Sequence, residues 1–337
     1  MKIAVLGAGA WGTALAVSFS AKHEVRLWGR NREQLLAAAS TRTNASALPG
    51  ITLPQALHIV TELNEALANA DLALIATATA GLAAVAQDVH QLQPAIPIIW
   101  ACKGFDKTSG ELPHEVVGRL LAAPNRACTA SVSKPHYGVL SGPSFAMEVA
   151  KGLPTALTLA ANDFAFAQKT AATLNSQSVR VYSNADLIGV ELGGALKNVM
   201  AIAAGIGDGM QLGMNARAAL ITRGLAEMMR LGVAMGGRAE TFMGLTGLGD
   251  LVLTATGSLS RNRTVGIALA EGKSLAQILQ TLGHVAEGVN SAQVARGLAK
   301  KFNVQMPITE AVYAVLFERA DAKAALKQLL ARETKAE

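Results

Sequence analysis

Short apolar runs alternate with amphipathic stretches over the first half of the chain. Residues 2–6 (KIAVL) form an apolar run, a glycine-rich turn follows, and residues 11–21 have the apolar spacing of a helix. A second short run at 25–28 and a helical segment from Asn31 complete a strand–turn–helix–strand unit, the start of a parallel, doubly wound sheet. The same criteria predict strands at 57–61, 71–76, 96–101, 137–141, 155–160 and 178–182, and helices at 80–91 and 113–122.

From Ala185 onward this alternation ends, and long Ala-, Leu- and Met-rich stretches take its place. No alternating strand pattern occurs there, so the second half is predicted to be all helical. We therefore expect an α/β domain over 1–188 and a helical domain over 189–337, closely packed, with the cleft between them as the ligand site. The predicted helices span 186–206, 215–235, 263–271, 274–282, 287–302 and 307–318, separated by glycine-rich turns such as GLTGLGD at 244–250.

The composition argues against several classes of protein. The chain has 337 residues, of which 51% are hydrophobic and 16% charged, so a large buried core is expected rather than disorder. The net charge of +6 suits an anionic ligand, but aromatic residues do not interleave with lysine and arginine, so no nucleic-acid partner is expected. Cys102 and Cys128 have no metal-binding spacing and the histidines form no HxxxH pair, so no metal is expected either.

The chain is expected to be cytoplasmic. The apolar run that ends at Phe19 superficially resembles a signal peptide, but glycines interrupt it and a strand pattern follows. The apolar stretch at 187–214 contains Glu191, Lys197 and Asp208 and is too polar for a membrane span.

The segment GAGAWG at 7–12 is a GxGxxG motif between a predicted strand and a predicted helix. Gly7 permits a tight turn, Gly9 lets the backbone approach a pyrophosphate, and Gly12 lets the helix pack closely on the strand. The helix N-terminus adds free N–H groups and a partial positive charge for the phosphates. The motif therefore predicts a dinucleotide site.

The second predicted strand lacks the terminal carboxylate that usually accepts hydrogen bonds from the ribose of NAD. It ends in Trp28-Gly29-Arg30, with Arg32 close behind. Arginine pairs with phosphate through two parallel hydrogen bonds, so this segment favours the 2′-phosphate of NADP. The alternative is that Arg30 is an ordinary loop arginine that points to solvent.

Three later motifs bring polar residues into apolar surroundings. WACKG (100–104) follows an apolar strand, so Lys103 is predicted at the carboxyl end of the sheet, where α/β folds bind ligands. GGALKN (193–198) places Lys197 in an apolar helix, where it either extends to solvent, the commoner case, or is partly buried and able to act as an acid or base. GLGDLVLTATGSLSRNR (247–263) holds further polar side chains that need hydrogen bonds or a ligand: Asp250, Thr254, Arg261 and Asn262.

Together these segments resemble the bacterial NAD(P)-dependent glycerol-3-phosphate dehydrogenases over nearly the whole chain. The resemblance rests on GAGxWGTALA, WACKG, LSGPSFAMEVAKGLPTA, YSNADLIGVELGGALKNVMAIAAG, NARAALITRGLAEM, TFMGLTGLGDLVLTATGSLSRNR, and VAEG followed by MPITEAVY. It implies a Rossmann-type doubly wound domain followed by an all-helical substrate domain. It also implies reversible reduction of dihydroxyacetone phosphate to glycerol 3-phosphate by NADPH or NADH, which supplies phospholipid synthesis. A homodimer is expected.

The resemblance also implies a role for each site residue. Lys197 would be the catalytic acid/base, and Lys103 would contact both cofactor and substrate. The other predicted substrate residues are Gly142, Ser144, Asn198, Asp250, Thr254, Ser260, Arg261 and Asn262. With the glycine turn and Arg30, the predicted cofactor site comprises Gly7, Gly9, Ala10, Trp11, Gly12, Arg30, Lys103, Ala146, Arg261, Val285 and Glu287.

This chain departs from the family pattern in two places. The family commonly has Ser where this chain has Ala10, and often has Val-Pro-Ser where this chain has Thr77-Ala78-Thr79. Both departures concern the cofactor contacts rather than the reaction.

The expected chemistry explains these residue types. As hydride reaches the keto carbon, negative charge grows on the carbonyl oxygen, and an ammonium can stabilise it and then donate a proton. Lys197 suits both tasks, with Asp250 or Asn198 to orient it, while Arg261, Asn262 and a helix N-terminus suit the substrate phosphate. Two alternatives remain: a reductase of another small keto or hydroxy acid, whose substrate would carry a carboxylate, and a non-catalytic NAD(P)H-sensing protein.

Overall fold

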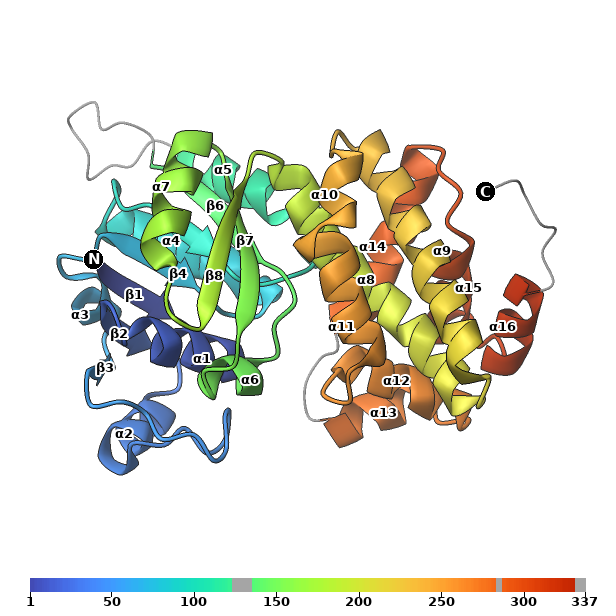
Figure 1. Cartoon of the computed structure of the whole chain (residues 1–337), viewed down its shortest axis with the longest axis horizontal. Coiled ribbons are helices and arrows are strands. Elements are labelled where there is room, and N and C mark those ends of the chain that lie inside the picture. Colours follow the sequence, from blue (N-terminus) through green and yellow to red (C-terminus); the bar gives the residue numbers. More distant parts are fainter. Residues whose placement is uncertain (123–134, 283–286, 331–337) are drawn as a thin grey trace. The chain divides into compact units, whose positions relative to one another are not determined.

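The computed structural model describes residues 1–122, 135–282 and 287–330. The chain divides into two compact units, Met1–Leu187 and Ile188–Glu337. Within the described residues, the first unit combines a sheet with helices and the second contains helices alone (Figure 1). The predicted fold class, a doubly wound sheet followed by a helical part, is confirmed.

An eight-stranded sheet forms the centre of the first unit, in the order β3-β2-β1-β4-β5-β6-β7-β8. From β1 the chain adds β2 and β3 on one side, and from β4 it adds the later strands on the other side. Doubly wound sheets bind ligands at the point where the direction of strand addition reverses, which here lies between β1 and β4. The strands are β1 (Lys2–Leu6), β2 (Glu24–Trp28), β3 (Leu57–Ile59), β4 (Leu72–Ile75), β5 (Ile98–Trp100), β6 (Tyr137–Ser141), β7 (Thr155–Ala161) and β8 (Val179–Asn184).

Helices cover both faces of this sheet, which is why its central strands read as continuous apolar runs rather than alternating ones. On one face, Leu15 and Phe19 of the first helix pack with Val5 and Leu74 of the strands in the main core, and all four side chains are fully buried. The helical segments are α1 (Ala10–Phe19), α2 (Arg32–Thr41), α3 (Leu63–Leu67), η1 (Thr79–Gly81), α4 (Leu82–Leu92), α5 (Pro113–Ala122), α6 (Ala146–Ala150) and α7 (Phe164–Leu174).

One strand pair departs from the parallel arrangement with which the sheet starts. Strands β6 and β7 run antiparallel, with Leu140 opposite Leu159, whereas every other neighbouring pair in the sheet is parallel. Residues 142–154, which connect them, hold only the five-residue helix α6. A parallel crossover normally needs a longer helix that can span the sheet, so this short connection returns the chain in the opposite direction.

The second unit is built around α8, a 23-residue helix at Leu187–Gly209 whose residues are buried from Gly189 to Gly207. By length and composition this helix could cross a membrane, but 89% of its most apolar window is buried inside the protein, as in a core helix. The remaining helices are α9 (Gly213–Ala234), α10 (Ala239–Met243), η2 (Leu245–Gly249), α11 (Asp250–Thr256), α12 (Arg261–Ala270), α13 (Leu275–Leu282), α14 (Glu287–Lys301), α15 (Pro307–Phe317) and α16 (Ala322–Leu330).

The segment GLTGLGD, predicted to be a turn, is helical. Residues Leu245–Gly249 form a π-helix, with the Gly249 N–H donating to the Gly244 carbonyl five residues earlier at 3.1 Å, and α11 continues directly from Asp250. The backbone of Phe242 lies so close to Gly247 that a Cβ atom would overlap its carbonyl. Close packing thus overrides the low helix propensity of the glycines.

Candidate functional site

The turn after β1 has the geometry that its glycines predict. Gly7 has a φ of +131°, a conformation that side chains rarely tolerate, and its N–H donates to the Trp28 carbonyl at 2.7 Å. At Gly12 a Cβ atom would overlap the Gly7 carbonyl, so helix α1 can approach the strand only with glycine there. The fold itself therefore requires both residues.

Gly9 is different, because a Cβ atom there would meet nothing within 4 Å. Neither packing nor a positive φ requires glycine at this position, since its φ is −74°. The Cβ would instead extend into open space at the N-terminus of α1, a ten-residue helix that begins at Ala10. A backbone kept bare beside free helical N–H groups, at the β1–β4 reversal, fits the pyrophosphate of a dinucleotide.

Arg30 follows β2 and is exposed, and no ion pair or hydrogen bond of its side chain occurs among the described residues. Arg32 instead forms a long 3.8 Å ion pair with Glu62, in which both side chains are largely exposed. Of the two arginines, Arg30 is therefore the one available to an anionic ligand.

The loop that departs from the family pattern lies against the glycine turn. A Cβ atom on Gly7 would contact the backbone of Ala76 and Thr77, just after β4. The Thr77 hydroxyl is buried and has no hydrogen-bond partner in the described part of the chain, and the same holds for the Trp11 indole N–H. These two buried polar groups lie on the two adjacent segments that we expect to meet the cofactor, Trp11 after the glycine turn and Thr77 after β4.

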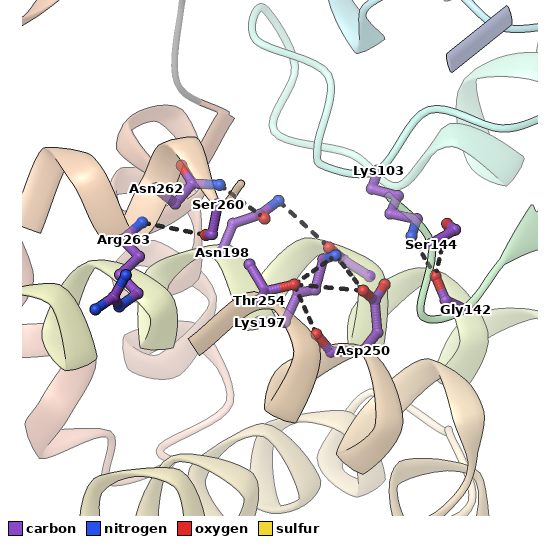
Figure 2. Close-up of polar contacts among 11 residues, drawn as sticks. Lys103, Gly142, Ser144, Lys197, Asn198, Asp250, Thr254, Ser260, Asn262 and Arg263 are labelled. Carbon is purple, nitrogen blue, oxygen red and sulfur yellow. Dashed lines mark hydrogen bonds and ion pairs between the residues drawn. The ribbon is translucent and has the colours of Figure 1, made fainter. Parts of the chain in front are cut away.

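Lys103 lies beyond the carboxyl end of β5, as predicted. Because β5 and β6 are parallel neighbours, the segments that follow them meet at one edge of the sheet. There the Lys103 ammonium donates to the Gly142 carbonyl at 2.7 Å, and the Ser144 hydroxyl donates to the same oxygen at 3.1 Å (Figure 2). Ala146 is the first residue of α6, just after this group.

In the second unit, Lys197 of α8 is buried, with 7% of its surface exposed, which excludes the solvent-facing interpretation. Its Nζ forms an ion pair with Asp250, which is 1% exposed, and donates to the Thr254 hydroxyl at 3.0 Å (Figure 2). The Thr254 hydroxyl in turn donates to the Asp250 backbone carbonyl at 2.6 Å, so it accepts from the lysine. Two groups one turn apart on α11 thus hold the ammonium on α8.

A chain of amides lies beside this ion pair. The Asn262 side chain donates through Nδ2 to Asn198 Oδ1 at 2.9 Å and accepts through Oδ1 from the Gly288 N–H at 3.1 Å. Asn198 donates to the Gly194 carbonyl within α8 at 3.4 Å. Of the two groups predicted to orient Lys197, Asp250 is the one that bonds it, while Asn198 joins α8 to α12, and Asn262 continues the chain to α14.

The N-terminus of α12 carries the remaining predicted residues. The Ser260 hydroxyl caps the helix by accepting from the Arg263 N–H at 3.3 Å. Arg261 is exposed, and none of the described residues pairs with its guanidinium. Glu287 opens α14, and Val285 lies outside the described residues. A capped helix end with an available guanidinium is suited to an anion.

Arg263 was not among the predicted site residues, and its ion pair with Asp208 was not predicted. Its guanidinium pairs with Asp208 on α8, which also pairs with Arg217 on α9. The sequence does show two arginines, Arg261 and Arg263, on either side of Asn262. In the structure Arg261 faces solvent, whereas Arg263 points inward to Asp208. No group of three or more His, Cys, Asp or Glu side chains placed to hold a metal occurs among the described residues.

Comparison with protein families matches both units. Residues 2–167 match the model for the N-terminus of NAD-dependent glycerol-3-phosphate dehydrogenase, and residues 186–327 match the model for its C-terminus. The chain is 54% identical to a glycerol-3-phosphate dehydrogenase [NAD(P)+] of Nitrosomonas europaea, covering 100% of this chain and 99% of that protein. It is 53% identical to the enzyme of the same name from Aromatoleum aromaticum, with complete coverage of both.

Solved structures show the same relationship. The crystal structure of glycerol-3-phosphate dehydrogenase from Coxiella burnetii superimposes with a TM-score of 0.90 at 41% identity, covering 98% of this chain and 99% of that one. D-Mandelate dehydrogenase in complex with NADH matches with a TM-score of 0.59 at 14% identity, covering 96% of this chain and 99% of that one. At 14% identity the second match shows a shared fold alone.

Proposed function

Because the chain belongs to the NAD-dependent glycerol-3-phosphate dehydrogenase family, we propose that it reduces dihydroxyacetone phosphate to sn-glycerol 3-phosphate, reversibly, with NADPH or NADH as the reductant. The observation that carries this proposal is the buried Lys197–Asp250 pair on α8 and α11, in the unit that matches the family's C-terminal model. A buried charge pair is stable only when it is well hydrogen-bonded, and such sites are commonly functional.

The first unit binds the dinucleotide. The bare backbone at Gly9 and the N-terminus of α1 receive the pyrophosphate, and Arg30 attracts the 2′-phosphate of NADP. Once bound, the nicotinamide supplies the hydride for the reaction. Lys103, fixed by its hydrogen bond to Gly142, contacts both cofactor and substrate.

Lys197 acts on the substrate carbonyl. In the reducing direction its ammonium donates a hydrogen bond to the carbonyl oxygen, stabilises the negative charge that develops there, and then transfers its proton to form the alcohol. Asp250 and Thr254 hold Nζ in place, so little reorganisation is needed when the charge develops. In the oxidising direction the neutral amine accepts the alcohol proton.

The N-terminal turn of α12 binds the substrate phosphate. Arg261 provides a planar fork of donors and the helix end provides backbone N–H groups, capped by Ser260. Asn262 uses its side chain to join α8 and α14, so it supports this turn as well as lining it.

A reductase of a small keto acid is the alternative, because D-mandelate dehydrogenase shares the fold. The deciding assay measures NADPH oxidation with dihydroxyacetone phosphate and, separately, with 2-keto acids. We expect rapid oxidation with the phosphate ester alone. Faster oxidation with a keto acid, or none with dihydroxyacetone phosphate, would overturn the proposed substrate.

We further propose that the enzyme acts in the cytoplasm as a homodimer and supplies glycerol 3-phosphate for phospholipid synthesis. Its full-length similarity to bacterial glycerol-3-phosphate dehydrogenases supports this. Sedimentation equilibrium should give about twice the chain mass of 34.8 kDa. A mass equal to one chain at micromolar concentration would contradict the dimer.

A further inference from the structure

A three-residue ion network joins three helices of the second unit. Asp208, on the last turn of α8, accepts at Oδ1 from Nε (2.8 Å) and Nη2 (2.5 Å) of Arg217 on α9. Its other oxygen, Oδ2, accepts from Nε of Arg263 on α12 at 2.6 Å. All three side chains are largely buried, with 11–19% of their surfaces exposed. Both carboxylate oxygens therefore already accept hydrogen bonds from arginine side chains.

This network lies next to a close contact between α8 and α12. A Cβ atom on Gly205 would overlap the Arg263 carbonyl, and one on Gly266 would overlap the Ile202 carbonyl, so the two backbones touch directly. Backbone contact fixes the distance between the helices but provides little resistance to sliding or rotation. The bond from Asp208 to Arg263, one turn further along α8, provides that resistance. The first turn of α12 is thereby locked in register.

We propose that Asp208 is a positioning residue for substrate binding. Through Arg263 it fixes the α12 turn from which Arg261 and Asn262 reach the substrate phosphate, while Arg217 holds the carboxylate from its other side. This inference rests on the proposed function, since it assigns the phosphate to the N-terminus of α12. Both oxygens of Asp208 are bonded to arginines, so in this proposal Asp208 acts on the substrate only through Arg263.

Because Asp208 is negatively charged, the direction in which its substitution changes the KM for dihydroxyacetone phosphate tests the proposal. Its negative charge near a phosphate site disfavours the phosphate, so by charge alone Asp208→Asn would lower the KM for dihydroxyacetone phosphate. If Asp208 instead holds the turn in place, the same substitution releases Arg263 and raises this KM. The two effects of one substitution therefore have opposite directions.

The test is steady-state kinetics of Asp208→Asn and of the charge-preserving variant Arg263→Lys. We expect the KM for dihydroxyacetone phosphate to rise about tenfold in both, with kcat within about twofold of wild type and the KM for NADPH unchanged. The inhibition constant of inorganic phosphate should rise in parallel, whereas kcat/KM for phosphate-free dihydroxyacetone should not change. Arg263→Lys keeps the positive charge and loses only the planar set of guanidinium N–H donors. It therefore remains informative if Asp208→Asn folds poorly.

Glu310→Gln is the control, because it weakens a 2.7 Å bond to Arg296 that joins α14 to α15 in the same unit and involves no residue of α8 or α12. Its melting temperature should fall less than that of Asp208→Asn, because the Glu310 side chain is 41% exposed and Arg296 keeps a second ion pair with Glu318, and the KM for dihydroxyacetone phosphate should not change. An unchanged or lowered KM in Asp208→Asn, or a fall in kcat alone, overturns the positioning role. If wild type itself fails to reduce dihydroxyacetone phosphate, the proposed function fails instead, and the two results cannot be confused.

Discussion

At the scale of single residues, the burial of Lys197 and Asp250 means that removing either one has two separate effects. Lys197→Ala should lower kcat by at least ~100-fold, because the group that stabilises the developing oxyanion is lost. It also leaves Asp250 buried without its cation, which destabilises the fold by roughly 3–5 kcal/mol. Parallel measurements of kcat and melting temperature should detect both losses.

Lys197→Arg separates these two effects. A guanidinium preserves the positive charge beside Asp250 but does not release its proton near neutral pH. We expect this variant to keep most of the stability and the affinity for NADPH while losing turnover. If Lys197→Arg or Lys197→Ala retains more than about a tenth of wild-type kcat, Lys197 is not the acid/base.

Arg261→Ala should raise the KM for dihydroxyacetone phosphate by about ten- to a hundredfold, because a charge-assisted pair with the phosphate is lost. Arg261 has no described partner in the protein, so its removal should leave the melting temperature unchanged. Phosphate-free dihydroxyacetone is the control substrate. Equal losses for both substrates would mean that Arg261 does not bind the phosphate.

Arg30→Asp should reverse the preference between cofactors, because it removes an attraction for the 2′-phosphate and adds a ribose acceptor. We expect wild type to prefer NADPH by about ten- to thirtyfold at low salt, and less at moderate salt. The measurement is kcat/KM for NADPH and NADH in both proteins. Arg32→Ala is the control, and it should change little because Arg32 already pairs weakly with Glu62. An unchanged ratio in Arg30→Asp would mean that the preference arises elsewhere.

The sequence could identify candidate residues at this scale but not their bonds. Lys197 and Asp250 stand out as polar groups among apolar ones, since burying either without a partner is unfavourable. Whether Asp250 or Asn198 would orient the lysine could not be decided, because that depends on how α8 and α11 are rotated against each other. Asn198, although adjacent to Lys197, points to another helix, as neighbours on a helix do.

At the scale of elements, a single buried carboxylate connects α9 to the start of α15. Glu227 is 1% exposed and accepts the backbone N–H groups of Ile308 at 2.6 Å and Thr309 at 3.2 Å. These are among the N–H groups that a helix N-terminus leaves without internal partners. Burial raises the pKa of Glu227 from 4.5 to about 7, although these two hydrogen bonds act in the opposite direction.

The raised pKa of Glu227 predicts how stability depends on pH. Between pH 4.5 and about 7 the folded protein binds a proton that the unfolded chain has released. The stability contributed by this group is therefore complete below pH 4.5 and is lost as the pH rises toward 7, by on the order of 3 kcal/mol. Glu227→Gln cannot titrate, so its urea midpoint should change less than that of wild type over this range. Equal slopes would show that the Glu227 pKa is not raised.

The bounds of helices and strands were predicted well where apolar residues recur at a regular spacing. The type or direction of an element was predicted poorly where contacts with distant residues determine it. Strand β1 and helix α5 have the expected bounds, because both combine a regular pattern with clear end signals. The antiparallel direction of β7 was not predicted, since direction depends on the connection rather than on the strand's own residues. The π-helix before Asp250 was read as a turn, because its glycines face a close backbone contact that no local pattern encodes.

At the scale of the whole molecule, each unit carries its own ligand groups, so each ligand should protect a different part of the chain. In hydrogen-exchange experiments NADPH alone should protect most strongly the amides of the β1–α1 turn, and inorganic phosphate alone those at the start of α12. The reason is that backbone N–H groups at these helix ends donate directly to the anions. Strong protection at the start of α12 by NADPH, with none by phosphate, would contradict the assignment of the two anion sites.

The change from alternating strands and helices to helices alone was visible in the sequence because the two architectures need different apolar periods. What the sequence could not provide is the joining of α8, α9 and α12 through Asp208. Its partners lie on two other helices, and no local spacing relates them.

The π-helix before Asp250 also limits how this gene can change over generations. Its wide turn holds one residue more than an α-helical turn would. Deleting one codon within Leu245–Gly249 would rotate the following helix by about 100° and carry Asp250 and Thr254 away from Lys197. A substitution such as Leu248→Ala leaves that rotation unchanged. Except at Gly247, where a Cβ atom would overlap the Phe242 carbonyl, descendants that keep the activity should therefore vary in the residues of this segment far more readily than in its length.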